Sequence, residues 1–210
     1  SGSLLFWFKS FLDELEKKHG HRNSTLLMHT DPKDMNGQDL HSIALKLDLI
    51  KNNNIYFSNQ KVAPQDLAML YNAADTTITV SDAEGFGLYT FESMACGTPI
   101  ITTLTGGLQE QVLSIGLEPA SKAIIGSQQV PYIYEDRVCG PQVVDALMTM
   151  YSYGKEKREE LGNNCINKIV KEYSFEEYAK SWDDLIVDVY NRFGSWENRK
   201  NYSPWELVKV

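Results

Sequence analysis

The feature of the sequence that most limits its fold is an alternation of strand-like and helix-like segments between residues 25 and 102. Short apolar or β-branched runs predict buried strands at 25–29, 55–58, 76–80 and 98–102. Helices are predicted between them, where apolar residues recur every three or four positions, over 40–50, 64–71 and 88–96. Short connections between such elements produce parallel strands with helical crossovers. The sequence therefore predicts an α/β fold, a Rossmann-like open, mostly parallel sheet with helices on both faces.

The flanking regions extend this pattern at both ends. A further helix is predicted over 4–18, and three helices close the chain near 141–152, 155–171 and 174–192. The intervening stretch 114–141 contains scattered Pro, Gly and Ser and is too long for a plain connection; the resemblance given below implies that it is an insertion. Short strands are expected within it at 123–125 and 132–134.

The expected domain organisation follows from these segments. Residues 1–3 (Ser-Gly-Ser) resemble a linker remnant, and residues 4–193 are expected to form one Rossmann-like domain. The tail 194–210 carries Trp196, Tyr202 and Trp205, and aromatic residues of this size are expected to dock on another surface.

Charge and cysteine usage exclude several classes of protein. The net charge of −8 and a pI near 5.0 lack the basic surface that nucleic acid or an anionic membrane requires. No apolar run approaches the roughly 18 residues of a membrane helix, so no transmembrane segment is expected. The three cysteines, Cys96, Cys139 and Cys165, are widely separated, which predicts reduced thiols and a cytoplasmic protein. Four scattered histidines without a partnered carboxylate predict no metal site.

The segment DAEGFGLYTFESMACGTPII, residues 82 to 101, carries the chemistry of the chain. It places Glu84 in the turn after a predicted strand and Glu92 about one turn inside the next helix. The glycines between them let the backbone approach a ligand, and free amides at the helix start can bind a phosphate. A carboxylate beside a phosphate is better suited to accept hydrogen bonds from sugar hydroxyls, which predicts a phosphate between two sugars. The alternative is an exposed loop glutamate and a second glutamate favoured by the helix N-terminus.

The same segment resembles a known family. EGFGLYTFESMACGTPII is similar to the glutamate–seven residues–glutamate signature of retaining glycosyltransferases with the GT-B fold (glycosyltransferase family 4-like, glycosyl transferases group 1). LAMLYNAADTTITVSDAEGFG resembles the family's helix and strand that lead into this signature, and GGLQEQV, residues 106–112, resembles its Gly-Gly-x-x-Glu segment. The similarity extends over about residues 25 to 113.

The resemblance implies roles for the matched residues. Glu92 would bind the ribose hydroxyls, and Glu84 would lie near the transferred sugar. The turn Glu84, Gly85, Phe86, Gly87, Leu88 and Tyr89 would hold the sugar and the diphosphate, largely through its amides. The loop Gln60, Lys61 and Val62 would contact the base. No catalytic residue, no metal and no cofactor is expected in this chain; the donor itself, a nucleoside-diphosphate sugar, is the substrate.

The resemblance covers one half of a two-domain enzyme. The family's Arg and Lys pair follows the first strand of this domain, and the chain as given starts at the next helix, so we expect a donor-binding domain with little turnover by itself. The intact enzyme would transfer a hexosyl group, with retention, to an acceptor held by a separate N-terminal domain. The alternatives are a nucleotide-sugar epimerase of GT-B architecture and a non-catalytic binding module. In the insertion, Arg137 or Glu135 could enter the site, or the segment could pack against the other domain, which we favour. The last helix would cross to that domain.

Overall fold

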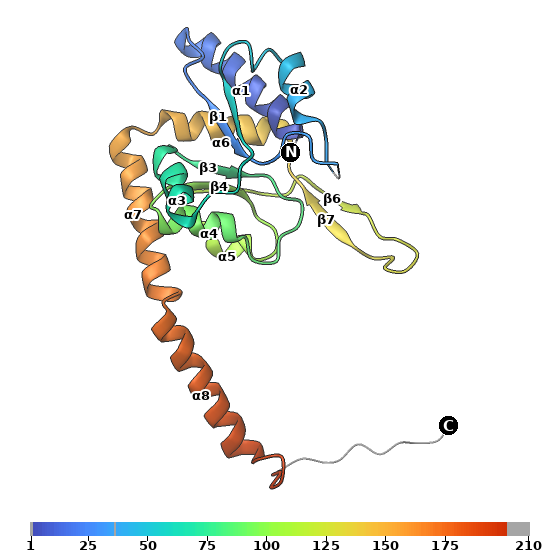
Figure 1. Ribbon diagram of the computed structural model, residues 1–210, viewed down its shortest axis with the longest axis vertical. Coiled ribbons are helices and arrows are strands. Elements are labelled where there is room, and N and C mark those ends of the chain that lie inside the picture. Colours follow the sequence, from blue (N-terminus) through green and yellow to red (C-terminus); the bar gives the residue numbers. More distant parts are fainter. Residues whose placement is uncertain (1, 36, 201–210) are drawn as a thin grey trace. The chain divides into compact units, whose positions relative to one another are not determined.

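The computed structural model describes residues 2–35 and 37–200, and it confirms the alternation of strands and helices (Figure 1). The helices are α1 (Gly2–His19), α2 (Leu40–Lys46), α3 (Pro64–Ala73), α4 (Leu88–Ala95), α5 (Leu108–Gln111), α6 (Gly140–Ser152), α7 (Lys155–Glu172) and α8 (Phe175–Phe193). The strands are β1 (Leu26–His29), β2 (Ile55–Ser58), β3 (Thr77–Thr79), β4 (Ile100–Thr103), β5 (Ile115–Leu117), β6 (Ser121–Ile124) and β7 (Tyr134–Arg137).

Strands β1 to β5 all pair in parallel, as the sequence predicts. Strand β1 pairs with β2, and β4 lies between β3 and β5. The two parallel groups border a common cavity of about 1140 Å³, lined by all of β1 and by the start of β3. Helices α1 and α6 lie on one side of the β3–β4–β5 sheet, and α3, α4 and α5 lie on the other (Figure 1). Because β3, β4 and β5 are parallel, their carboxyl ends lie at the same edge of the sheet. Ligands bind at this edge in sheets of this type.

Helix α1 supplies a large share of the hydrophobic core. Its buried apolar residues recur every three or four positions, so they share one face: Leu4, Leu5, Phe8, Phe11, Leu12 and Leu15. This face packs with α6 and with the inner face of the strands, where Ile101 and Leu117 are buried. Because successive strand residues point to opposite faces, Ile100 and Ile101 are buried on different sides of β4.

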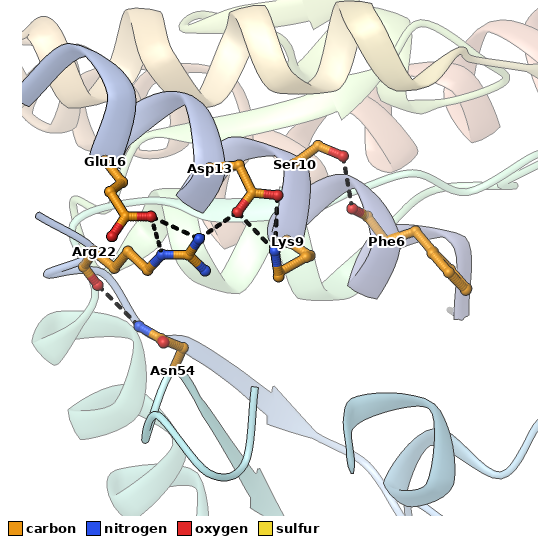
Figure 2. Close-up of polar contacts among 7 residues, drawn as sticks. All are labelled: Phe6, Lys9, Ser10, Asp13, Glu16, Arg22 and Asn54. Atoms are coloured by element: carbon orange, nitrogen blue, oxygen red, sulfur yellow. Dashed lines mark hydrogen bonds and ion pairs between the residues drawn. The ribbon is translucent and has the colours of Figure 1, made fainter. Parts of the chain in front are cut away.

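Polar contacts on the opposite face of α1 fix the loop that leads into β1 (Figure 2). The Arg22 guanidinium donates from Nε to Glu16 at 2.8 Å and from Nη2 to Asp13 at 2.5 Å. Asn54, which is buried, donates from Nδ2 to the carbonyl of Arg22 at 2.9 Å and to that of Ser24 at 2.7 Å. A buried amide satisfied by two loop carbonyls holds the start of β1 against the end of the α2–β2 connection.

Most element ends agree with the sequence prediction, and the differences have local causes. Helix α2 ends at Lys46 rather than near residue 50, because Asp48 and Asn53 adopt positive φ angles of 56° and 55° in the turns that follow. Helix α1 begins at Gly2, so Gly2 and Ser3 of the expected linker are helical. Gly97 ends α4 with a φ of +76°, and Ser174 caps α8 by accepting from the amide of Glu177 at 3.2 Å.

The stretch 114–141 expected as an insertion divides in two: β5 joins the parallel sheet, and residues 121–137 form a hairpin that the sequence only partly predicts. Strands β6 and β7 pair antiparallel, with Ser121 opposite Arg137 and Ile124 opposite Tyr134. The second strand was expected at 132–134, but it lies at 134–137, because Ile125 and Ile133 already belong to the loop end of the hairpin. Strand β5 and the short helix α5 were not predicted, since three or four residues give too little periodicity.

The chain divides into two compact units, and the described residues 167–200 belong to the second of them. Within it, α8 carries an extensive exposed apolar surface that includes Trp182, Leu185 and Ile186. Trp196 is 84% exposed, and the Arg199 guanidinium lies 3.8 Å from the centre of its ring. The expectation that Trp196 docks on another surface stays a prediction, and Tyr202 and Trp205 lie outside the described residues. Among the described residues, no helix is both long and apolar enough to span a membrane.

Replacing Leu12 with Ala tests the role of α1 in the core. Leu12 is fully buried, so its truncation should lower the free energy of unfolding by about 2–5 kcal/mol. Leu45→Ala is the matched control, because Leu45 is 58% exposed on α2 and its loss should cost less than about 0.5 kcal/mol. Urea unfolding followed by circular dichroism measures both, and equal effects would contradict the proposed core.

Candidate functional site

The predicted motif lies at the carboxyl edge of the sheet, in the turn between β3 and α4. Strand β3 ends at Thr79, and α4 begins at Leu88, so Glu84 lies in the connecting turn and Glu92 lies one turn inside the helix. The next strand, β4, ends at Thr103, and the segment Gly106–Gly107 follows it. Because β3 and β4 are parallel neighbours, both turns emerge at the same edge.

Gly87 opens α4 in a conformation that favours glycine. Its φ is +86°, and an added Cβ would lie 2.8 Å from Thr90 Oγ1 and would also overlap Leu108. The carbonyl of Gly87 accepts the first helical bond, from Phe91 N at 3.1 Å. The amides of Leu88, Tyr89 and Thr90 precede that bond, so they have no carbonyl within the helix to donate to. Their positive ends suit an anionic group.

The Gly106–Gly107 segment packs directly on the motif turn. The amide of Gly107 donates to the carbonyl of Glu84 at 3.1 Å. A Cβ on Gly106 would overlap that carbonyl, and one on Gly107 would overlap the carbonyl of Gly85. Gly106 also has a φ of +49°. The two turns can approach this closely because neither glycine has a side chain, which explains the Gly-Gly pair in physical terms.

Gln111 is a site residue that the sequence analysis missed. Its side chain is 1% exposed, and Nε2 donates to the carbonyl of Phe86 in the motif turn. Its Oε1 accepts from the Thr90 hydroxyl at 2.6 Å. A buried amide with both ends bonded fixes the turn to the start of α4. A glutamine among the four residues of a short helix gives no pattern from which this role could be inferred.

Tyr89 connects Glu84 to the end of β3. Its phenol donates to Glu84 Oε2 at 2.9 Å, accepts from Thr79 Oγ1 at 3.2 Å, and lies 2.9 Å from Ser81 Oγ. Burial raises the pKa of the Tyr89 phenol, and the hydrogen bond to Glu84 acts in the same direction, against the contributions of Ser81 and Thr79. The sequence analysis assigned Tyr89 only a backbone role, so this contact is an additional finding.

Tyr71 holds Glu92 in a similar way, from helix α3. Its phenol donates to Glu92 Oε2 at 3.0 Å. Burial and then the hydrogen bond to Glu92 raise the pKa of the Tyr71 phenol far above its usual range. The Tyr71 carbonyl accepts from Thr98 Oγ1 at 2.8 Å, which ties the end of α3 to the start of the β4 segment.

The hairpin joins the site at Asp82, just ahead of Glu84. The Arg137 guanidinium forms an ion pair with the Asp82 carboxylate, and the amide of Asp136 donates to the Asp82 carbonyl at 2.8 Å. Arg137 also pairs with Glu135 at 2.5 Å. Two roles were considered for this segment. Arg137 reaches the motif turn, as the first role requires. Packing against another domain stays a prediction.

The predicted base-binding residues lie on the loop between β2 and α3. Gln60 and Lys61 are exposed, and Val62 is half-buried. This loop follows the carboxyl end of β2, and it leads into the helix whose Tyr71 contacts Glu92. Base binding by these three residues stays a prediction.

The arrangement presents two carboxylates on either side of a glycine-opened helix start. Glu84 is half-buried and Glu92 is exposed, and each gives one oxygen to a tyrosine phenol. Within the described part of the chain, no three His, Cys, Asp or Glu side chains gather as a metal would require. Such a site can accept hydrogen bonds from hydroxyls at two points and donate backbone amides to an anion between them.

Part of the chain is similar to a known protein family. Residues 36–115 match the family model of the glycosyl transferases group 1. D-inositol 3-phosphate glycosyltransferases are 51% identical over 51 residues in Streptosporangium roseum and 42% identical over 66 residues in Thermomonospora curvata. These matches cover 24% and 28% of this chain but only 12% and 15% of the relatives' length.

Solved structures match over most of the chain. The sucrose-phosphate synthase of Thermosynechococcus elongatus superimposes with a TM-score of 0.61 at 20% identity, over 87% of this chain and 42% of that one. The C-terminal domain of a Francisella tularensis glycosyl transferase group 1 family protein has a TM-score of 0.57 at 20% identity. The match covers 83% of this chain and 80% of that one. Anabaena HepE, in complex with UDP-glucose, has a TM-score of 0.56 at 16% identity. The match covers 85% of this chain and 53% of that one.

The fold is therefore that of one half of a GT-B glycosyltransferase. The family-model match over residues 36–115 spans less than half of the chain, and it makes this region similar to the glycosyl transferases group 1 family. Both glutamates, both tyrosines, the Gly106–Gly107 segment and Gln111 fall inside the matched region, whereas the β6–β7 hairpin and helices α6 to α8 lie beyond it.

Gly106→Ala tests the close approach of the two turns. The added Cβ would clash with the Glu84 carbonyl at a positive φ, so the free energy of unfolding should fall by about 1–2 kcal/mol or more. Gly85→Ala is the matched control in the same turn, because its Cβ would meet no atom within 4 Å. Its effect on chemical denaturation should stay within about 0.5 kcal/mol. A neutral Gly106→Ala would show that the turns can separate without cost.

The raised pKa of Tyr71 predicts how stability changes in alkali. In the unfolded chain the phenol ionises near pH 10, whereas in the folded chain it stays protonated to higher pH. The folded state then binds the proton more tightly, so the free energy of unfolding should fall as pH rises beyond about 10. Tyr71→Phe should lose less stability than the unmodified chain between about pH 9 and about pH 11. Parallel losses in urea unfolding would show that Tyr71 titrates normally; exposed Tyr178→Phe is the control.

Proposed function

We propose that this chain is the donor-binding half of a retaining hexosyltransferase. In this proposal a nucleoside-diphosphate sugar binds at the carboxyl edge of β3 and β4, and a separate N-terminal domain holds the acceptor. The observation that carries the proposal is the pair of carboxylates on either side of the glycine-opened start of α4, each held by a tyrosine phenol. The similarity of residues 36–115 to the glycosyl transferases group 1 family supports transfer of a sugar.

Each part of the donor has a matching group in this proposal. Glu92 accepts from the ribose hydroxyls, and Glu84 accepts from hydroxyls of the sugar that is transferred. The amides of Phe86, Gly87, Leu88 and Tyr89 bind the diphosphate and the sugar, helped by the positive end of α4. Gln60, Lys61 and Val62 contact the base. The fold shared with Anabaena HepE, whose structure contains UDP-glucose, supports a donor of this class.

The proposed chemistry needs no nucleophile from this chain. Retention would come from attack on the face that the diphosphate leaves, so the enzyme contributes positioning and stabilisation of the departing diphosphate. The two glutamates then act as binding groups. No metal or cofactor enters this proposal. Cys96, Cys139 and Cys165 are free thiols, which supports the proposed cytoplasmic location.

Calorimetric titration of UDP, GDP, ADP and their glucose conjugates into the chain tests the proposal. One nucleotide should bind, and Glu92→Ala should weaken it by about 1–3 kcal/mol, the cost of losing a charged acceptor of two hydroxyl hydrogen bonds. Glu176→Gln is the control, because Glu176 is an exposed carboxylate on α8.

Three outcomes would count against the proposal in different ways. Binding that Glu92→Ala leaves unchanged would remove the ribose role. Absence of binding by every nucleotide at millimolar concentration would contradict a donor site in this chain by itself. Release or epimerisation of the sugar without any acceptor, followed by NMR, would favour an epimerase of the same architecture.

A further inference from the structure

We propose that Tyr71 and Tyr89 are positioning residues that orient the two glutamates toward different ends of the donor. This inference rests on the proposed function and extends it to two side chains that would not touch the ligand. Tyr71 would set the recognition of the ribose through Glu92. Tyr89 would set the recognition of the transferred sugar through Glu84.

The contact between Tyr71 and Glu92 joins two helices. Tyr71 lies near the end of α3 and Glu92 lies in α4, 21 positions further along the chain, and their oxygens are 3.0 Å apart. Glu92 is an exposed side chain, which alone would sample several rotamers. Tyr71 is half-buried, and its backbone is held by Thr98, so the phenol is a fixed donor. One glutamate oxygen is therefore held in place before any ligand binds.

The contact between Tyr89 and Glu84 has the same form within the motif. The phenol lies among Thr79 Oγ1, Ser81 Oγ and Glu84 Oε2, all within 3.2 Å. The end of β3 thus fixes the phenol, and the phenol fixes the carboxylate of Glu84. Tyr89 is half-buried in the first turn of α4, so its phenol is held by the helix as well as by the end of β3.

In both pairs the tyrosine uses one carboxylate oxygen and leaves the other. Among residues 2–35 and 37–200, Oε1 of Glu84 and Oε1 of Glu92 have no protein donor. An oriented carboxylate with one free oxygen can accept from ligand hydroxyls without first losing rotamer freedom. The two tyrosines act on separate glutamates, so their effects on a ligand should be separable.

The test compares Tyr71→Phe and Tyr89→Phe with UDP, 2′-deoxy-UDP and UDP-glucose as ligands, or with the guanosine or adenosine set if that base binds. The unmodified chain should bind UDP more tightly than 2′-deoxy-UDP. Tyr71→Phe should reduce this ratio of dissociation constants by about tenfold and leave the ratio of UDP to UDP-glucose unchanged. Tyr89→Phe should change the ratio of UDP to UDP-glucose and leave the ratio of UDP to 2′-deoxy-UDP unchanged. Tyr178→Phe, an exposed tyrosine on α8, should change neither ratio.

A double-mutant cycle separates positioning from a structural role. If Tyr71 acts through Glu92, adding Tyr71→Phe to Glu92→Ala should cause little further loss of UDP affinity. Glu92→Asp gives an independent test that leaves α3 untouched: the shorter side chain keeps the charge but withdraws from the phenol, so discrimination against 2′-deoxy-UDP should fall. Melting temperatures identify any variant that does not fold.

The proposal would be overturned if Tyr71→Phe weakened UDP and 2′-deoxy-UDP equally, or if both ratios responded alike to the two tyrosine variants. Additive losses in the double-mutant cycle would also reject it. These results differ from failure of the proposed function, in which the unmodified chain binds none of the nucleotides and both proposals fall together.

Discussion

The site depends on the close approach of two strand-to-helix turns at one edge of a parallel sheet. The amide of Gly107 donates to the carbonyl of Glu84, and a Cβ at Gly106 or Gly107 would overlap the carbonyls of the motif turn. This contact fixes the backbone between β3 and α4 from the side of β4. Gln111 adds a second connection through the carbonyl of Phe86. The glutamates can have defined positions only because the turn between them is held in this way.

Two tyrosine phenols hold the carboxylates in place relative to this backbone. The network runs from Thr79 and Ser81 through Tyr89 to Glu84, and a separate contact runs from Tyr71 to Glu92. Burial raises the pKa of both phenols, since it disfavours the phenolate. A protonated phenol beside a carboxylate is a stable donor, and it adds no charge to a site that already contains two acids.

The hairpin makes the motif turn part of a larger structure. Arg137 of β7 pairs with Asp82, and the backbone of Asp136 contacts the same residue. The hairpin lies outside the region matched by the family model, yet its strand β7 contacts the turn that carries Glu84. A displacement of β7 would therefore act on Asp82 first and on Glu84 two residues later.

The sequence by itself determined the α/β class, the parallel order implied by alternating elements, and the placement of Glu84, Gly87 and Glu92 at a strand-to-helix turn. It could do so because these features depend on local periodicity and on the glycine requirement at positive φ. The tertiary structure alone decided the partners of those residues. Tyr71 lies 21 positions from Glu92, Gln111 lies 25 from Phe86, and Arg137 lies 55 from Asp82, so no local pattern records these contacts. They arise where parallel strands bring distant turns to one edge, which is a property of the assembled sheet.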